Sequence, residues 1–182
     1  MSKPGANTVT IPARITTEGL ADAIGRPLSE VAGVLTQRHE PDGFDHVLSA
    51  SLAVEVAKEL GARVVVEARD LALERLYAYE SVGEVVETPD GRAGHLFGGV
   101  IERVDELDAQ IEAASEHWSV ARMPVIDRNI LRIGLFELDH DRGTPTPVIV
   151  AEAVRMAQTY STERSSSFVN GVLVTLAKEV RD

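Results

Sequence analysis

Residues 124–138 constrain the fold of this chain most strongly. Pro124 suits the first turn of a helix, and the residues after it place large apolar side chains on more than one helical face. A helix that is apolar on several faces must be buried among other elements. These apolar residues are Ile126, Ile130, Leu131, Ile133, Leu135 and Leu138. The sequence therefore predicts a helical core with this segment at its centre.

Four further segments have apolar residues at helical spacing: 67–80, 95–118, 147–157 and 168–180. Segment 95–118 is predicted to be one long helix, because two seven-residue series interleave along it. The series are Phe97, Val104, Ile111 and Trp118, and Val100, Leu107 and Ala114. Gly98 and Gly99 within this segment predict a close helix–helix contact, and a similar contact or a specific hydrogen bond is expected at Asn170 and Gly171. The fold class is all-α, a helical bundle.

The N-terminal part of the chain predicts a separate small module. Residues 1–10 are small and polar and are expected to be a disordered tail. Residues 11–63 contain three short apolar helical patterns and form a mainly helical module with short strands, too small to be very stable alone. Residues 64–66 are three valines that could form a strand or lead into the next helix. The main domain is expected over residues 64–182.

The composition argues against catalysis and against metal or cofactor binding. The chain has no Cys, and its five His residues are scattered along it. His140 between two aspartates is expected in an exposed loop. There is no phosphate-binding loop, dinucleotide fingerprint or nucleophile elbow. No apolar run is long enough for a membrane span, and the N-terminus has no signal-peptide pattern, so a soluble, cytoplasmic protein is expected. No catalytic residue, metal or cofactor is predicted.

The formal net charge of −11 restricts any interaction with nucleic acid. Phosphate contacts require lysine and arginine side chains, because these neutralise the phosphates and release the counterions of the nucleic acid. Neither the N-terminal module nor the main domain is basic. An RNA contact would therefore need a local patch or a basic partner protein.

Several segments resemble the NusB family, in the order in which that family has them. They are 68–77 (ARDLALERLY), 107–111 (LDAQI) with Trp118, 123–138 (MPVIDRNILRIGLFEL), 147–154 (PVIVAEAV) and 167–173 (SFVNGVL). The resemblance covers residues 64–182. It implies a NusB-like RNA-binding domain that binds boxA-type RNA of ribosomal RNA transcripts with NusE, the S10-type ribosomal protein, in the RNA polymerase antitermination complex. Some members dimerise, so a homodimer is an additional expectation.

The resemblance also implies roles for individual residues. Asp127 corresponds to a position on the NusE-facing side, or else stabilises the first turn of its helix through the macrodipole. An aromatic ring can stack on an unpaired base, and arginine can bind phosphate. For Phe168 and Tyr77 the alternative is core packing, and for Arg69 it is a solvated face. The predicted RNA-binding residues are Arg69, Tyr77, Tyr160, Arg164 and Phe168.

Four departures from the NusB pattern concern RNA affinity. The arginine-rich stretch that usually precedes the first helix reads VVVE at residues 64–67, and the segment 81–94 after that helix is short. Ala151 replaces a common Asn. Arg164 replaces a residue that is often acidic or polar, and it adds positive charge near Phe168.

The N-terminal module resembles the small N-terminal domain of bacterial translation initiation factor 2. The similar segments are 15–25 (ITTEGLADAIG), 28–31 (LSEV) and 52–61 (LAVEVAKELG). Two alternatives to an antitermination factor remain open at this stage. One is a protein-only scaffold that has lost RNA binding, and the other is a NusB-like accessory module of the RNA methyltransferase type.

Overall fold

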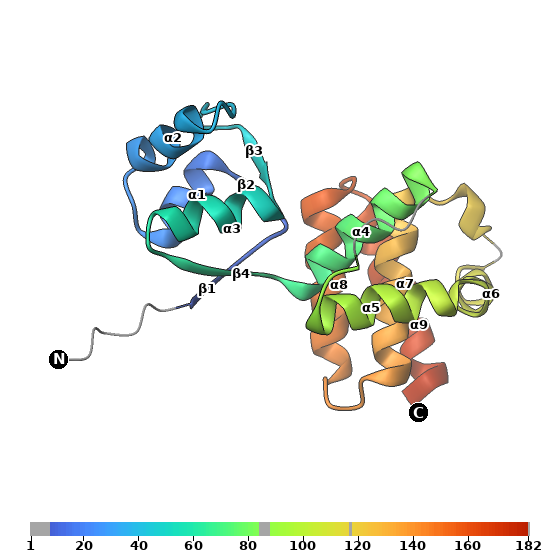
Figure 1. The fold of residues 1–182 in the computed structure, drawn as a ribbon. Coiled ribbons are helices and arrows are strands. Elements are labelled where there is room, and N and C mark those ends of the chain that lie inside the picture. The colour runs from blue at the N-terminus through green and yellow to red at the C-terminus, as the bar shows by residue number, and fades with distance from the viewer. Residues whose placement is uncertain (1–7, 84–87, 117, 182) are drawn as a thin grey trace. The chain divides into compact units, whose positions relative to one another are not determined.

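The computed structural model describes residues 8–83, 88–116 and 118–181, shown in Figure 1. The chain divides into two compact units, residues 1–71 and 72–182. Each unit has its own hydrophobic core. The sequence placed the start of the second domain at residue 64, a few residues before this division.

The first unit combines three helices with two small sheets. Strand β1 (Thr8–Ile11) pairs in parallel with β4 (Arg63–Val66), and β2 (Arg14–Thr16) pairs antiparallel with β3 (Val47–Ser49). The helices are α1 (Thr17–Ile24), α2 (Leu28–Gln37) and α3 (Ala50–Glu59). Fully buried core side chains include Ile11, Leu20, Val31, Leu35, Leu48 and Val56. The predicted small module with short strands is present.

Local sequence signals set the ends of these helices. The Thr16 hydroxyl accepts a hydrogen bond from the Gly19 amide at 3.0 Å, and the Ser49 hydroxyl accepts one from Leu52 at 3.4 Å. Both are N-caps, which satisfy free amides at a helix start. Gly25 ends α1 with φ of 65°, a left-handed conformation that glycine adopts without a steric penalty.

Two expectations for this region are settled by the pairing of β1 with β4. Residues 8–10 were predicted to be part of a disordered tail, but they form β1. Residues 1–7 lie outside the described residues. The valines of residues 64–66 form a strand and do not lead into a helix. β-Branched side chains favour this conformation when a partner strand is available.

The second unit is a helical bundle built around α7 (Val125–His140), which packs against α5 (Gly91–Glu102), α6 (Val104–Ala114), α8 (Thr146–Tyr160) and α9 (Ser165–Arg181). α4 (Ala68–Val82) and the 3₁₀ helix η1 (Val120–Arg122) complete the described elements. The side chains of α7 from Asn129 to Leu138 are all buried. The predicted all-α class and the central position of this segment are confirmed.

The predicted single helix over residues 95–118 is wrong. Two helices occupy this region instead. α5 begins earlier, at Gly91, and α6 follows after Arg103, whose φ of −122° and ψ of 18° are not helical. Asp105 and Glu106 then occupy the first turn of α6, where acidic residues favour a new helix start. Trp118 lies after α6 and outside any described helix.

The glycine predictions have mixed outcomes. A Cβ at Gly99 would lie 2.1 Å from the Phe136 ring, so α5 approaches α7 as closely as predicted. No such approach occurs at Gly171, because a Cβ there would have no neighbour within 4 Å. Both Asn170 and Gly171 are exposed. Their expected packing role is therefore wrong.

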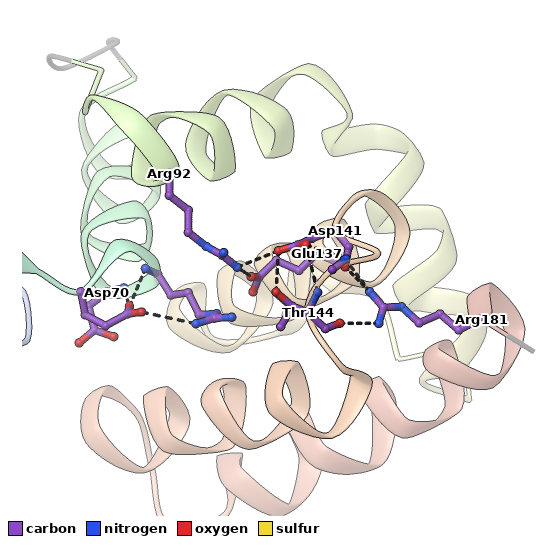
Figure 2. A network of polar contacts seen from close by, with 9 residues as sticks. Asp70, Arg92, Glu137, Asp141, Thr144 and Arg181 are labelled. Atoms are coloured by element: carbon purple, nitrogen blue, oxygen red, sulfur yellow. Dashed lines mark hydrogen bonds and ion pairs between the residues drawn. The ribbon is translucent and has the colours of Figure 1, made fainter.

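A polar network ties the C-terminal end of α7 to α5 and α9 (Figure 2). The guanidinium of Arg92 donates to the buried carboxylate of Glu137 and, at 3.0 Å, to Asp141. Arg181 donates to the carbonyl oxygens of Glu137 at 3.0 Å and Asp141 at 2.7 Å. The hydroxyl of Thr144 donates to Asp141, which lowers the pKa of that carboxyl. The bonds of Arg181 thus cap the C-terminal end of α7, where the Glu137 carbonyl also accepts the Asp141 amide at 2.9 Å.

Among the described residues, no helix has both the length and the apolar character needed to cross a bilayer.

Candidate nucleic-acid interface

The first turns of α7 hold the connection between α8 and α9 through a buried carboxylate. Asp127 is 3% exposed, and its carboxylate accepts hydrogen bonds from the hydroxyls of Ser161 and, at 2.8 Å, Ser165. Ser165 is the first residue of α9. A buried carboxylate is tolerated when hydrogen-bond donors surround it. Asp127 therefore fixes where α8 ends and where α9 begins.

The next residue of α7, Arg128, and Arg132 one turn later hold the end of α4 by ion pairs. Arg128 donates to the carboxylate of Glu80 at 2.8 Å, and Arg132 donates to the same carboxylate. Arg132 also binds Asp108 of α6 through two nitrogens, each at 2.7 Å. Burial raises the pKa of Glu80, but hydrogen bonds from the two arginines outweigh burial and keep this pKa below its usual value. The carboxylate is ionised at neutral pH.

The N-terminal half of α7 thus gathers α4, α6 and the α8–α9 connection. Four of the predicted RNA-binding residues belong to these same elements. Tyr77 lies on α4 one turn before Glu80, Tyr160 ends α8, and Arg164 and Phe168 flank the start of α9. The polar contacts of α7 place these elements around its first turns.

The exposure of the predicted residues decides between some of the alternatives. Tyr77 is 47% exposed, so it is not a core residue. Arg164 is exposed, whereas Tyr160 and Phe168 are partly buried against the hydrophobic core. For Phe168 the core-packing alternative applies in part, because part of its ring packs and part remains accessible. Its RNA contact stays a prediction.

Arg69 does not lie on a solvated face. It is 8% exposed, and its guanidinium lies 3.4 Å from the carboxylate of Glu67. That same carboxylate accepts the backbone amides of Arg69 at 2.6 Å and Asp70 at 3.1 Å, and so caps α4. The solvated alternative for Arg69 is wrong, and its RNA contact stays a prediction.

Asp127 is also in a different environment from that expected of a partner-binding residue. Its carboxylate is enclosed by Ser161 and Ser165 within the chain. The direct contact with an S10-type partner stays a prediction, while the position on the first turn of α7 agrees with the macrodipole alternative.

Trp118 was not among the predicted RNA-binding residues, because its spacing assigned it to a buried helical stripe. Its side chain is 53% exposed, and its ring centroid lies 5.5 Å from that of Phe168 with an interplanar angle of 54°. The two rings line an open groove between the end of α6 and one face of α9. The polar run SEH just before Trp118 was the available signal that the helix had ended.

Hydrogen bonds hold the backbone that carries Trp118. The Ser115 hydroxyl donates to the carbonyl of Trp118 at 3.0 Å, and the amide of Trp118 donates to the carbonyl of Ser115 at 3.2 Å. The amide of Val120 donates to the carboxylate of Glu112 at 2.8 Å. Glu116 has φ of 52°, the left-handed conformation that ends many helices. The exposed indole is thus presented from a fixed turn.

These features define a helical-bundle protein with exposed aromatic and cationic side chains near the start of its central helix. The sequence model of the NusB family matches residues 51–178. The chain belongs to the NusB family, and the resemblance noted in the sequence is confirmed.

Individual relatives agree with this assignment. The chain is 37% identical over 128 residues to a transcription antitermination protein NusB of Clavibacter sepedonicus, covering 61% of this chain and 93% of the relative. It is 38% identical over 135 residues to the protein of the same name in Sorangium cellulosum, covering 66% of this chain and 95% of the relative.

Two solved structures share the fold. The structure of NusB from T. maritima has a TM-score of 0.56 and 31% identity, covering 63% of this chain and 91% of that one. A crystal structure of the antitermination factors NusB and NusE in complex with double-stranded RNA has a TM-score of 0.54 and 27% identity, covering 62% of this chain and 94% of that one.

Proposed function

We propose that this protein is a non-enzymatic transcription antitermination factor that acts in the cytoplasm. It binds boxA-type RNA of ribosomal RNA transcripts together with the S10-type protein NusE, within the RNA polymerase antitermination complex. The observation that carries the proposal is membership of the NusB family over residues 51–178, with relatives that are named transcription antitermination proteins. The similar fold of a NusB that was crystallised with NusE and RNA adds support.

The side chains near the start of α7 suit single-stranded RNA. Tyr77, Trp118 and Phe168 offer accessible aromatic surface on which unpaired bases can stack. Arg164 is exposed next to Phe168 and can contact phosphate. Sequence-specific RNA recognition uses unstacked bases of this kind.

The net charge of −11 makes a basic partner part of the proposal. The segment that is arginine-rich in the NusB pattern falls on strand β4 in this chain, and that strand has Arg63 as its one basic residue. Most of the phosphate contacts would then come from the S10-type protein. RNA affinity should accordingly be low for the chain alone and much higher for the complex.

The test is fluorescence anisotropy with a labelled boxA RNA, measured with and without the S10-type protein at 50 and 200 mM salt. We expect weak binding alone, tighter binding with the partner, and a salt dependence that is steeper for the complex. A scrambled RNA of equal length is the control. No binding in either condition at low salt would contradict the proposal.

A protein-only scaffold is the second candidate, favoured by the negative charge and by β4 in place of the arm. It predicts a complex with the S10-type protein that gains no RNA affinity. An accessory module of the RNA methyltransferase type is not favoured by relatives that are named antitermination proteins. Sedimentation of the purified chain tests the expected homodimer.

A further inference from the structure

We propose that the groove between Trp118 and Phe168 binds one unpaired base of the RNA, with Trp118 as its stacking surface. This inference rests on the proposed function and adds a residue for which the sequence predicted only core packing. The groove is lined by Ala114, Ser115, Glu116, Trp118, Ser167, Phe168, Gly171, Val172 and Thr175.

The groove is open because of two features of its walls. The rings of Trp118 and Phe168 are tilted by 54° with centroids 5.5 Å apart, so they do not cover each other face to face. On the α9 side, Gly171 contributes no side chain, and a Cβ there would meet nothing within 4 Å. A planar ring can therefore approach the indole over the space that Gly171 leaves free.

The stacking surface is already in place without ligand. The hydrogen bonds of Ser115 and Glu112 hold the turn on which Trp118 lies, and Phe168 packs partly against the core. Little conformational entropy is then lost when a base binds, which favours affinity.

The chemistry of the lining favours a nucleobase over an apolar protein side chain. The groove is also lined by the polar residues Glu116, Ser167 and Thr175. A base has an apolar face for the rings and a polar edge for these groups, and a carboxylate can accept from an exocyclic amino group.

Positive charge lies on both sides of the groove. Arg122 lines the adjoining hollow together with Trp118, and Arg164 precedes Phe168 by one helical turn. Both arginines are exposed. They can contact the phosphates that flank the bound base, which an apolar peptide would not use.

Trp118 is the sole tryptophan of the chain, so its fluorescence reports directly on this groove. The complex with the S10-type protein is titrated with boxA RNA, with excitation at 295 nm. The Trp118→Phe variant, titrated in the same way, gives the signal that belongs to the partner. We expect RNA to quench the fluorescence of the parent complex more than that of the variant complex. The difference between the two is the signal of Trp118.

Two substitutions test the groove without touching the core. Trp118→Leu removes the stacking surface, and Gly171→Leu fills the space beside it. Base–aromatic stacking predicts a loss of RNA affinity of about 5- to 150-fold for each. Gly33→Leu is the matched control, since it also adds a leucine at an open helical glycine, in α2 of the first unit, and it should bind RNA like the parent.

The outcomes separate this inference from the proposed function. If labelled RNA binds by anisotropy but the indole signal and the affinities of both groove variants are unchanged, the base lies elsewhere and the inference is overturned. If the indole is quenched by the S10-type protein alone, a protein segment occupies the groove, and the inference is again overturned. If no RNA binds with or without the partner, the proposed function itself fails. Melting temperatures of the variants verify that each remains folded.

Discussion

The close approach of α5 to α7 at Gly99 gives the sharpest test of the bundle. In Gly99→Ala, the new methyl carbon would lie 2.1 Å from Cζ and 2.4 Å from Cε2 of Phe136. Carbon atoms normally approach to about 3.5–4.0 Å, so the ring would have to move by roughly 1.5 Å. Phe136 is 2% exposed and has His140 stacked 4.5 Å from its centroid, which leaves the ring little room to move.

The expected magnitude combines two opposite effects. Replacing glycine by alanine inside a helix stabilises it by about 1 kcal/mol, and overpacking of a core costs about 1–3 kcal/mol. Gly98 lies on the same helix, but a Cβ there meets nothing within 4 Å. Gly98→Ala should therefore stabilise the protein, and Gly99→Ala should be about 1–3 kcal/mol less stable than Gly98→Ala.

The assay is urea unfolding followed by the fluorescence of Trp118, which lies in the same unit as both glycines. Phe136→Leu removes the ring edge, so in that background the difference between the two alanine variants should become smaller. Equal stability of Gly98→Ala and Gly99→Ala in the parent, or a difference unaffected by Phe136→Leu, would refute the reasoning.

Three further predictions concern the surroundings of α7. Asp127→Ala removes the carboxylate that accepts from two serine hydroxyls, so it should lower the free energy of unfolding by about 1–3 kcal/mol in thermal melts. If the variant instead loses binding of the S10-type protein at an unchanged melting temperature, the partner contact is supported. The arginines hold the pKa of Glu80 below that of a carboxyl in the unfolded chain. The stabilisation from this carboxylate is therefore complete above the unfolded-state pKa and is lost as the pH falls through the lower, folded-state pKa. Urea unfolding should therefore show the gap between the parent and Glu80→Gln narrowing from pH 7 to pH 3, and a constant gap would exclude the ion pair as its cause. Phe168→Ala should weaken RNA binding by about 1–3 kcal/mol in anisotropy titrations while the chain stays folded, whereas unfolding of the variant would mean that its core contacts dominate.

The helical core was predictable because its signal is local. Residues 129–138 of α7 are all buried, and the sequence indicates this by large apolar side chains on more than one helical face. The buried polar residues among them, Asn129, Arg132 and Glu137, were not predicted to be buried. The break at Arg103 was not predictable from the same kind of pattern. Both α5 and α6 pack on α7, so one seven-residue series continues across two helices and periodicity alone cannot show where the chain turns.

The candidate interface was harder to predict, because it depends on contacts between distant segments. The two serines that enclose Asp127 lie 34 and 38 residues further along the chain, a distance that no local motif spans. Trp118 had the correct spacing for a buried stripe, yet the turn fixed by Ser115 places it on the surface. Distant contacts thus decided the environment of Asp127, and a local turn decided that of Trp118.

The alternation of side chains along β4 has a consequence for where this protein can carry charge. Val64 and Val66 pack against the core of the first unit, while Val65 is 52% exposed. A cationic stretch cannot be rebuilt here by substitution, because charging the inward positions would destroy the sheet that β4 forms with β1. Apart from Arg63, the strand offers one site, residue 65, where an added arginine would be tolerated. Positive charge for phosphate contacts would therefore have to come from elsewhere on the chain or from another molecule.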